Sequence, residues 1–172
     1  MSRREKLLDQ IELLAMCDIT NPLTGPEGAA HVFSPQKGAD EGMIQELEAG
    51  MVHYASILEQ TVQIPKIREL PGGGAAGGMG TGMAALLGAK LIPGIQAVLD
   101  TVQIDTLAEH ADLILTGEGK IDSQSIHGKV LSGIARRGKA LGIPVVAIAG
   151  GIDREALPEP YRDGLTAAFS IN

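Results

Sequence analysis

The 172-residue chain is long enough for one sizeable domain, or for one domain and part of another. Its formal net charge of −7 argues against nucleic-acid binding, because contacts with phosphates need clustered Lys and Arg. The single cysteine, Cys17, excludes an internal disulfide and favours a reducing compartment. The sequence has no apolar stretch of about 18 residues that could span a bilayer. We therefore expect a cytoplasmic protein that binds neither nucleic acid nor membrane.

The first third predicts a strand and a long helix. Residues 11–17 form a short apolar run that is closed by Asn21-Pro22, and its length and flanks predict a buried strand. Asp40 has the position of an N-cap for a helix over Glu41–Thr61. Within that helix, apolar residues recur at three- and four-residue steps, which predicts one stripe facing the core.

A glycine cluster follows, with seven glycines between Gly72 and Gly82, and it leads into a predicted helix over residues 83–87. Gly72, Gly74 and Gly77 match the G-x-G-x-x-G spacing. A dinucleotide site needs a strand immediately before that motif, and the preceding residues are a poor strand. Backbone amides at a Gly-rich helix start can bind an anion. Glycines that allow close helix packing are the alternative, and the sequence leaves both open.

The last third alternates short apolar runs with helical patterns, after a predicted helix over residues 93–102. Three of the runs predict strands, at residues 112–116, 145–149 and 166–171. A helix at about residues 128–141 separates the first two, and a short helical connection separates the others. Strand, helix, strand, helix, strand is the pattern of a parallel sheet, so the fold class is α/β.

Residues 117–129, which follow the first of these strands, are predicted to be a polar loop. Its ionisable and amide side chains are those of Glu118, Lys120, Asp122, Gln124, His127 and Lys129. Carboxylates at a strand end suit Mg²⁺, and a nearby lysine would offset phosphate charge. The alternative is an exposed loop in which Ser125 caps the next helix. Because ligands bind at the carboxyl ends of strands in open α/β sheets, we expect a site here.

Residues 18–28 form another polar loop, directly after the first predicted strand. A turn alone would explain Asn21-Pro22, but it would not explain the acid Asp18 at the very end of an apolar strand. Elsewhere the sequence shows no Ser-His-Asp spacing, CxxC pair or HExxH element, so it gives no support to a hydrolase or a zinc enzyme.

These three loops, in this order, resemble the glycerate kinase family, which makes phosphoglycerate from ATP and D-glycerate. The matching segments are residues 17–30, 33–39, 71–80, 91–95, 111–129, 144–150 and 168–171. The resemblance implies a two-domain glycerate kinase fold, with part of a Rossmann-like parallel sheet plus an inserted α/β domain. Residues 1–107 would be mostly the inserted domain, and residues 108–172 the C-terminal half of the Rossmann-like domain.

The resemblance also implies an ATP-dependent phosphotransferase that uses ATP and Mg²⁺, with D-glycerate as substrate and 2-phosphoglycerate as the favoured product. The expected catalytic residues are Asp122, Lys129 and Glu118, and Glu118 and Asp122 would also hold the metal. The expected cofactor-binding amides belong to Gly72, Gly73, Gly74, Gly77 and Gly78. The expected substrate-binding residues are Asp18, Asn21, Lys37 and Gln124.

A second hypothesis comes from the ends of the chain. Members of the family are longer, and both ends look cut beside central strands, so the chain is expected to be an incomplete piece. It would then be an inactive fragment or a complementation partner with no catalysis alone. Exposed sheet edges would promote its self-association. A third hypothesis is a nucleotide-binding oxidoreductase domain that takes NAD in place of ATP.

Overall fold

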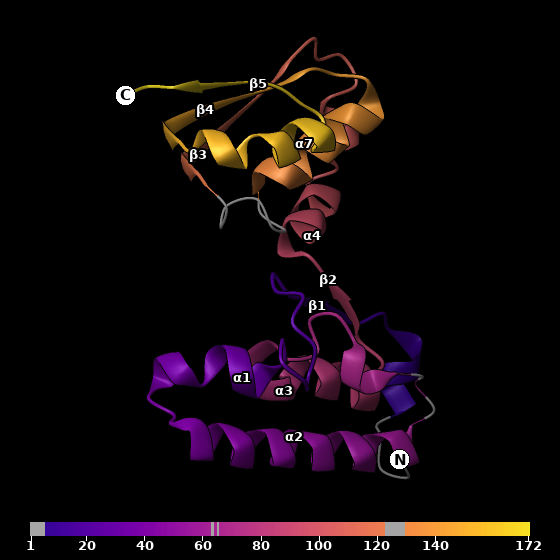
Figure 1. Ribbon diagram of the computed structural model, residues 1–172. Helices are drawn as coiled ribbons and strands as arrows, with labels where there is room; N and C mark the ends of the chain where they lie inside the picture. The colour runs from indigo at the N-terminus through magenta and orange to yellow at the C-terminus, as the bar shows by residue number, and fades with distance from the viewer. Residues whose placement is uncertain (1–5, 63, 65, 123–129) are drawn as a thin grey trace. The chain divides into compact units, whose positions relative to one another are not determined.

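The computed structural model describes residues 6–62, 64, 66–122 and 130–172 (Figure 1). The chain divides into two compact units, Met1–Ile92 and Pro93–Asn172. Each unit combines helices with a parallel sheet, which confirms the α/β fold class. Within the described residues, no helix is both long enough and apolar enough to cross a membrane. How the units correspond to the domains of the longer family fold stays a prediction.

The first unit holds a two-stranded sheet and a set of helices. Its elements are η1 (Lys6–Gln10), β1 (Leu14–Met16), α1 (Ala29–Phe33), η2 (Pro35–Lys37), α2 (Glu41–Thr61), η3 (Ile67–Glu69), α3 (Ala75–Gly82), the π-helical turn η4 (Met83–Leu87) and β2 (Lys90–Ile92). β1 pairs in parallel with β2, with Ala15 opposite Leu91. A strand in residues 11–17 is therefore confirmed over Leu14–Met16, but the prediction that it is buried was wrong, because Leu14 and Met16 are exposed. Strand β2 was not predicted.

Helix α2 has the predicted bounds, and a local signal explains its start. The side chain of Asp40 accepts a hydrogen bond from the N–H of Met43 at 2.9 Å, which is the N-cap arrangement. At the other end, Arg68 donates two hydrogen bonds to the carboxylate of Glu59, at 2.9 and 2.8 Å. These hydrogen bonds lower the pKa of Glu59 below its ordinary value. The apolar stripe of the helix buries Leu58 in a cluster of the first unit.

The second unit is a three-stranded parallel sheet with helices on one face. Its elements are α4 (Gly94–Thr101), α5 (Ile104–Leu107), β3 (Ile114–Ile121), α7 (Val130–Leu141), β4 (Val145–Ile152), η5 (Arg154–Ala156), α8 (Pro158–Asp163) and β5 (Leu165–Ser170). The strand order is β3-β4-β5, and both pairings are parallel. The predicted alternation of strands and helices is confirmed.

The core of the second unit lies between β4 and α7. Val145 and Ala147 alternate along β4 and are fully buried against Leu131 of α7. Helix α7 is tied to α8 by Arg136, which donates to the carboxylate of Asp163 at 3.0 Å. Burial acts to raise the pKa of Asp163, but hydrogen bonds from Arg136 and Ser132 outweigh it and leave the pKa lowered.

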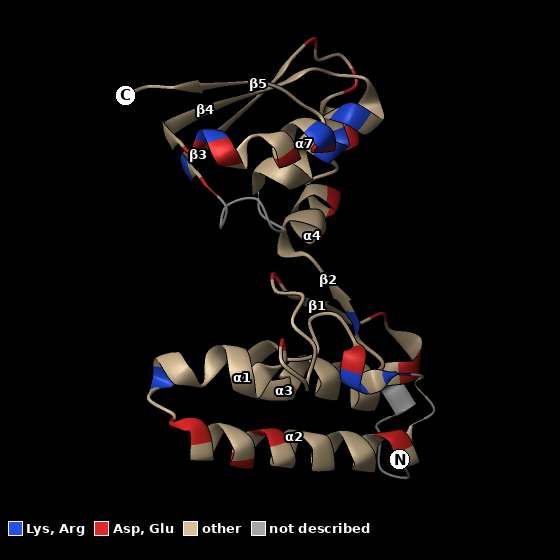
Figure 2. Cartoon of the chain, in the orientation of Figure 1, with Lys and Arg blue, Asp and Glu red and all other residues tan. Residues whose placement is uncertain are grey.

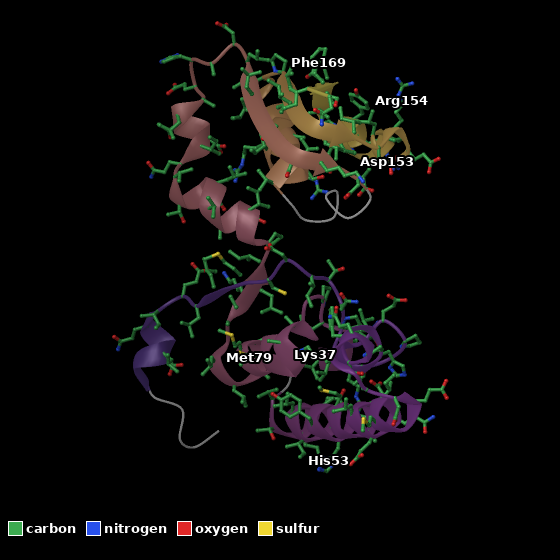
Figure 3. The ribbon with its side chains drawn as sticks, turned by 90° about the vertical axis from the view of Figure 1, so that its left-hand side faces the viewer. Lys37, His53, Met79, Asp153, Arg154 and Phe169 are labelled. Atoms are coloured by element: carbon green, nitrogen blue, oxygen red, sulfur yellow. The ribbon has the colours of Figure 1, made fainter. Side chains whose placement is uncertain are left out.

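The opposite side of this sheet carries an apolar surface, which we call the open face, formed by Leu115, Val146, Ile148, Ala167 and Phe169. The strand register brings these residues side by side, since Ile148 lies opposite Phe169 and Val146 lies opposite both Leu115 and Ala167. The exposed fractions are 63% for Leu115, 44% for Ile148 and 61% for Phe169, which is labelled in Figure 3. Contiguous exposed apolar side chains of this kind mark surfaces that take a partner.

Candidate functional site

In the first unit, the structure brings two of the predicted loops together. The loop at residues 18–28 follows β1, and the glycine cluster lies against it. The N–H of Gly74 donates to the carbonyl oxygen of Asn21 at 3.0 Å. A Cβ on Gly74 would collide with the carbonyl oxygen of Pro22. Only glycine allows the two backbone segments to approach this closely.

Close packing accounts for the first part of the glycine cluster. Gly72, Gly73 and Gly74 are buried, and the N–H of Gly73 donates to the carbonyl of Leu70 at 2.8 Å. The packing is between backbone segments, rather than between helices as the sequence suggested. The segment before the cluster is the 3₁₀ turn η3. This agrees with the prediction that no strand precedes the glycines. A dinucleotide site of the G-x-G-x-x-G type therefore lacks its preceding strand.

The second part of the cluster has an unusual backbone. Ala76, Gly77 and Gly78 have φ angles of 49°, 69° and 94°, so a left-handed turn interrupts α3. For the alanine this conformation costs about 1–2 kcal/mol. Ala76 and Gly77 are exposed and border a cavity of about 440 Å³, which is also lined by Tyr54, Gly78, Met79, Gly82, Met83, Leu86 and Leu87. The cavity offers backbone and apolar surface, and no charged side chain of the described chain lines it.

The predicted substrate residues of the first unit lie in two places. Asp18 is exposed at the start of the loop, and Asn21 is half-buried with its Nδ2 donating to the carbonyl of Glu27 at 2.9 Å. Lys37 is exposed at the end of η2 (Figure 3) and lines a cavity of about 710 Å³ beside α2. The structure therefore joins Asp18 and Asn21 in one loop and places Lys37 on a separate turn. The fourth residue, Gln124, lies outside the described residues.

The loop that the sequence predicted at residues 117–129 begins later in the structure. Strand β3 continues from the predicted end at Thr116 to Ile121, so Glu118 and Lys120 lie on a strand. The extension pairs with β4, where Glu118 lies opposite Ala149 and Ile121 opposite Ile152. Glycines permit this pairing, because a Cβ on Gly150 would lie 2.6 Å from the carbonyl oxygen of Gly119. The prediction of a polar loop from residue 117 was wrong for residues 117–121.

Asp122 comes directly after β3, at the carboxyl edge of the sheet. Its side chain is 28% exposed, and Oδ2 lies 3.8 Å from Nζ of Lys120. Glu118 is half-buried four residues earlier. Lys129, together with Ser125 and His127, lies outside the described residues. The structure thus places Asp122 at the end of β3 and Glu118 within the strand, about 13 Å away at roughly 3.3 Å per residue, so these two predicted catalytic residues are not brought together.

The donor set at this edge fits a hard cation only in part. Within the described residues, no group of three or more His, Cys, Asp and Glu side chains could hold a metal ion. Asp122 supplies carboxylate oxygens at this edge, which Mg²⁺ prefers, whereas Glu118 lies about 13 Å back along β3, too far to hold the same ion. Mg²⁺ commonly keeps several waters while binding one or two carboxylates. The residues present therefore suit Mg²⁺ better than a metal that needs a complete protein cage.

The sequence interpretation missed Asp153 and Arg154, which share this edge. Both follow β4 (Figure 3), and the N–H of Asp153 donates to the carbonyl of Ile121 at 2.8 Å. The side chain of Asp153 accepts a hydrogen bond from the N–H of Glu155 at 3.2 Å, so it also starts η5. An acid soon after an apolar run, in the segment Gly150-Gly-Ile-Asp153, was the available signal. Because the carboxyl ends of parallel strands meet at one edge of the sheet, such an acid is expected to lie at the same edge as Asp122.

A parallel sheet with acidic side chains at its carboxyl edge is typical of open α/β proteins, in which ligands bind outside the carboxyl ends of the strands. Comparison with known proteins gives the family. The chain belongs to the glycerate kinase family, whose sequence profile matches residues 1–172, and this confirms the resemblance drawn from the loops.

Three relatives illustrate the match. A glycerate kinase of Halalkalibacterium halodurans is 42% identical over 99% of this chain and 44% of its own length. The glycerate 2-kinase of Escherichia coli K12 is 43% identical over 90% of this chain and 40% of its own length. A crystal structure described as a glycerate kinase 2 from Salmonella typhimurium LT2 has a TM-score of 0.76 at 43% identity, and the match covers 96% of this chain and 42% of that one. The chain spans less than half the length of these relatives.

Proposed function

We propose that this chain is part of a glycerate kinase, and that the whole protein transfers the γ-phosphate of ATP to a hydroxyl of D-glycerate. The observation that carries the proposal is the family match over residues 1–172. The relative named glycerate 2-kinase supports the 2-hydroxyl as the acceptor. The product is then 2-phosphoglycerate, with ADP leaving.

The proposed chemistry needs positioning and charge stabilisation more than covalent help. The glycerate hydroxyl attacks the γ-phosphorus in line, so an oxygen–phosphorus bond forms while the bond to the ADP oxygen breaks. Asp122 orients that hydroxyl and accepts its proton, and Lys129 offsets phosphate charge. Mg²⁺, when bound, would neutralise charge on the phosphates, and Glu118 is its first ligand candidate, with Asp122 second.

The loop residues of the first unit are proposed to bind the substrate. Asp18, Asn21 and Lys37 offer a carboxylate, an amide and an ammonium group, which suit the hydroxyls and the carboxylate of glycerate. The amides of Gly73 and Gly74 already donate within the chain. The proposal of anion binding by the glycine cluster, made for Gly72 to Gly78, is therefore centred on the exposed turn at Gly77.

A coupled ADP-release assay with MgATP and D-glycerate tests the function. The 172-residue chain is compared with a chain extended to the length of the family relatives. We expect turnover from the extended protein and none from the chain alone, because the chain spans less than half of each relative. No turnover by a well-folded extended protein would rule out glycerate as the substrate.

We further propose that the chain alone self-associates through the open face and the sheet edges. The support is the row of exposed apolar side chains on β3, β4 and β5. Phe169→Lys should shift the chain toward monomer in size-exclusion chromatography with light scattering. Tyr161→Lys is the matched control, because Tyr161 is an exposed aromatic on α8 rather than on the open face. A monomeric parent chain at tens of micromolar would contradict this proposal.

A further inference from the structure

Glu48 of α2 reaches across to a turn of the loop at residues 18–28. Its Oε1 accepts a hydrogen bond from the N–H of Gly25 at 2.7 Å. The turn itself closes through the N–H of Gly28, which donates to the carbonyl oxygen of Gly25 at 2.8 Å. Hydrogen bonds with a charged acceptor are the stronger class, so α2 holds this turn firmly in place.

The second carboxylate oxygen of Glu48 has no such bond. Oε2 is buried and has no hydrogen-bond partner among the described residues. Nδ1 of His31, on α1, lies 3.5 Å from it. Every charged residue of α2 is a glutamate (Figure 2), so the helix supplies no cation of its own. A buried oxygen without a partner costs stability. The hydrogen bond from the N–H of Gly25 to Oε1 offsets that cost, so this contact explains why a carboxylate suits the position.

The same turn also holds the side chain of Asn21. The carbonyl of Glu27, between Gly25 and Gly28, accepts one amide hydrogen of the Asn21 side chain at 2.9 Å. The backbone carbonyl of Asn21 accepts the N–H of Gly74 at 3.0 Å, which fixes the other side of the loop. Asn21 keeps a second amide hydrogen and its Oδ1, and both can pair with a hydroxyl or a carboxylate.

We infer that Glu48 is a positioning residue, which fixes the Gly25 turn and through it the orientation of the Asn21 side chain for glycerate binding. The inference rests on the proposed function, because it takes Asn21 as a substrate ligand. Glu48 itself does not touch the substrate. Its loss should weaken glycerate binding and leave the chemical step unchanged.

Two measurements on four variants test this inference. Glu48→Ala removes the acceptor, and Glu48→Asp keeps the charge but shortens the reach. Glu48→Gln keeps an oxygen that can accept from Gly25. Glu41→Ala is the matched control, since Glu41 is an exposed glutamate of the same helix and is not among the residues that line the cavity beside Lys37. Amide hydrogen exchange at Gly25, followed by NMR, is measured on the 172-residue chain, and KM and kcat on the extended protein.

We expect Glu48→Ala and Glu48→Asp to speed exchange at Gly25 and raise KM for D-glycerate, each about tenfold, as for loss of one charge-assisted hydrogen bond. The kcat should stay within about twofold of the parent value. Glu41→Ala should match the parent in both measurements, and Glu48→Gln should lie between the parent and Glu48→Ala, because a neutral acceptor makes a weaker hydrogen bond.

Unchanged exchange at Gly25 in Glu48→Asp would overturn the inference, whatever the activity shows. Faster exchange with an unchanged KM would also overturn it, because the turn would then have no part in glycerate binding. A Glu48→Gln variant with a KM as high as that of Glu48→Ala would do the same. If the extended parent does not phosphorylate D-glycerate, the proposed function falls, and exchange at Gly25 alone decides whether Glu48 holds the turn.

Discussion

Replacement of Asp122 by Asn in the extended protein is expected to reduce kcat for glycerate phosphorylation by about 10²–10⁴-fold, the usual contribution of a positioned general base. Asparagine keeps the size of the side chain but cannot accept the proton of the attacking hydroxyl. Asp122 follows β3 and is not part of the buried core cluster of the second unit. The melting temperature and circular dichroism should therefore stay close to those of the parent protein.

The control for this substitution is Asp112→Asn, because Asp112 is an exposed acid that precedes the same strand. It should leave kcat unchanged in the same coupled assay. Near-normal turnover by Asp122→Asn would remove Asp122 from the mechanism. Glu118 would then become the first candidate for the base, since it is the half-buried carboxylate of the same strand.

The substitution Gly74→Ala is expected to lower the free energy of unfolding of the first unit by about 3 kcal/mol or more. The new Cβ would collide with the carbonyl oxygen of Pro22 and lie 3.1 Å from that of Asn21. Neither oxygen can rotate away, since both belong to the backbone. The hydrogen bond from the N–H of Gly74 to Asn21 would be strained as well.

Urea denaturation can follow the first unit by itself. The chain has two tyrosines and no tryptophan, so a Tyr161→Phe background leaves Tyr54 of α2 as the fluorescent reporter. Gly50→Ala is the matched control, because Gly50 lies within α2 and a Cβ there meets nothing within 4 Å. It should stabilise the unit by about 0.5–1 kcal/mol. Equal midpoints for Gly74→Ala and the parent would contradict the close contact with Pro22.

The elements that the sequence predicted well depend on local signals. Helix α2 has an N-cap at Asp40 and a long apolar stripe, and its bounds match the prediction. The strands β4 and β5 come from short apolar runs, of which one face is buried against the helices and the other forms the open face. By contrast, β2 (Lys90–Ile92) has only three residues and owes its existence to pairing with β1, which no local pattern reveals.

The error at β3 has the same physical origin. Residues 117–121 contain two glycines and two charged residues, which is typical of a loop. They form a strand because Gly150 of β4 leaves room for the backbone at Gly119. Strand pairing between segments about 30 residues apart is a tertiary effect that overrides local propensity.

The candidate site divides in a similar way. Asp122 was predicted as a site residue because it is an acid that comes soon after an apolar run. The structure places it directly after β3, at the expected edge of the sheet. The glycine cluster could not be interpreted from sequence, because its packing depends on the carbonyl groups of Asn21 and Pro22, about 50 residues earlier. Glu48 resembles any solvent-facing glutamate of a helix until its contact with Gly25 is seen.

The contact between Gly74 and Pro22 also bears on which mutations can compensate for one another. Where a glycine faces a side chain, a second mutation can restore the space: Gly82 would place a Cβ 2.7 Å from Oη of Tyr54, so Tyr54→Phe can suppress Gly82→Ala. Gly74 faces a peptide oxygen that every amino acid carries. No change of the neighbour's identity can relieve that clash, so a genetic screen should yield suppressors at Tyr54 for Gly82 and none at Pro22 for Gly74.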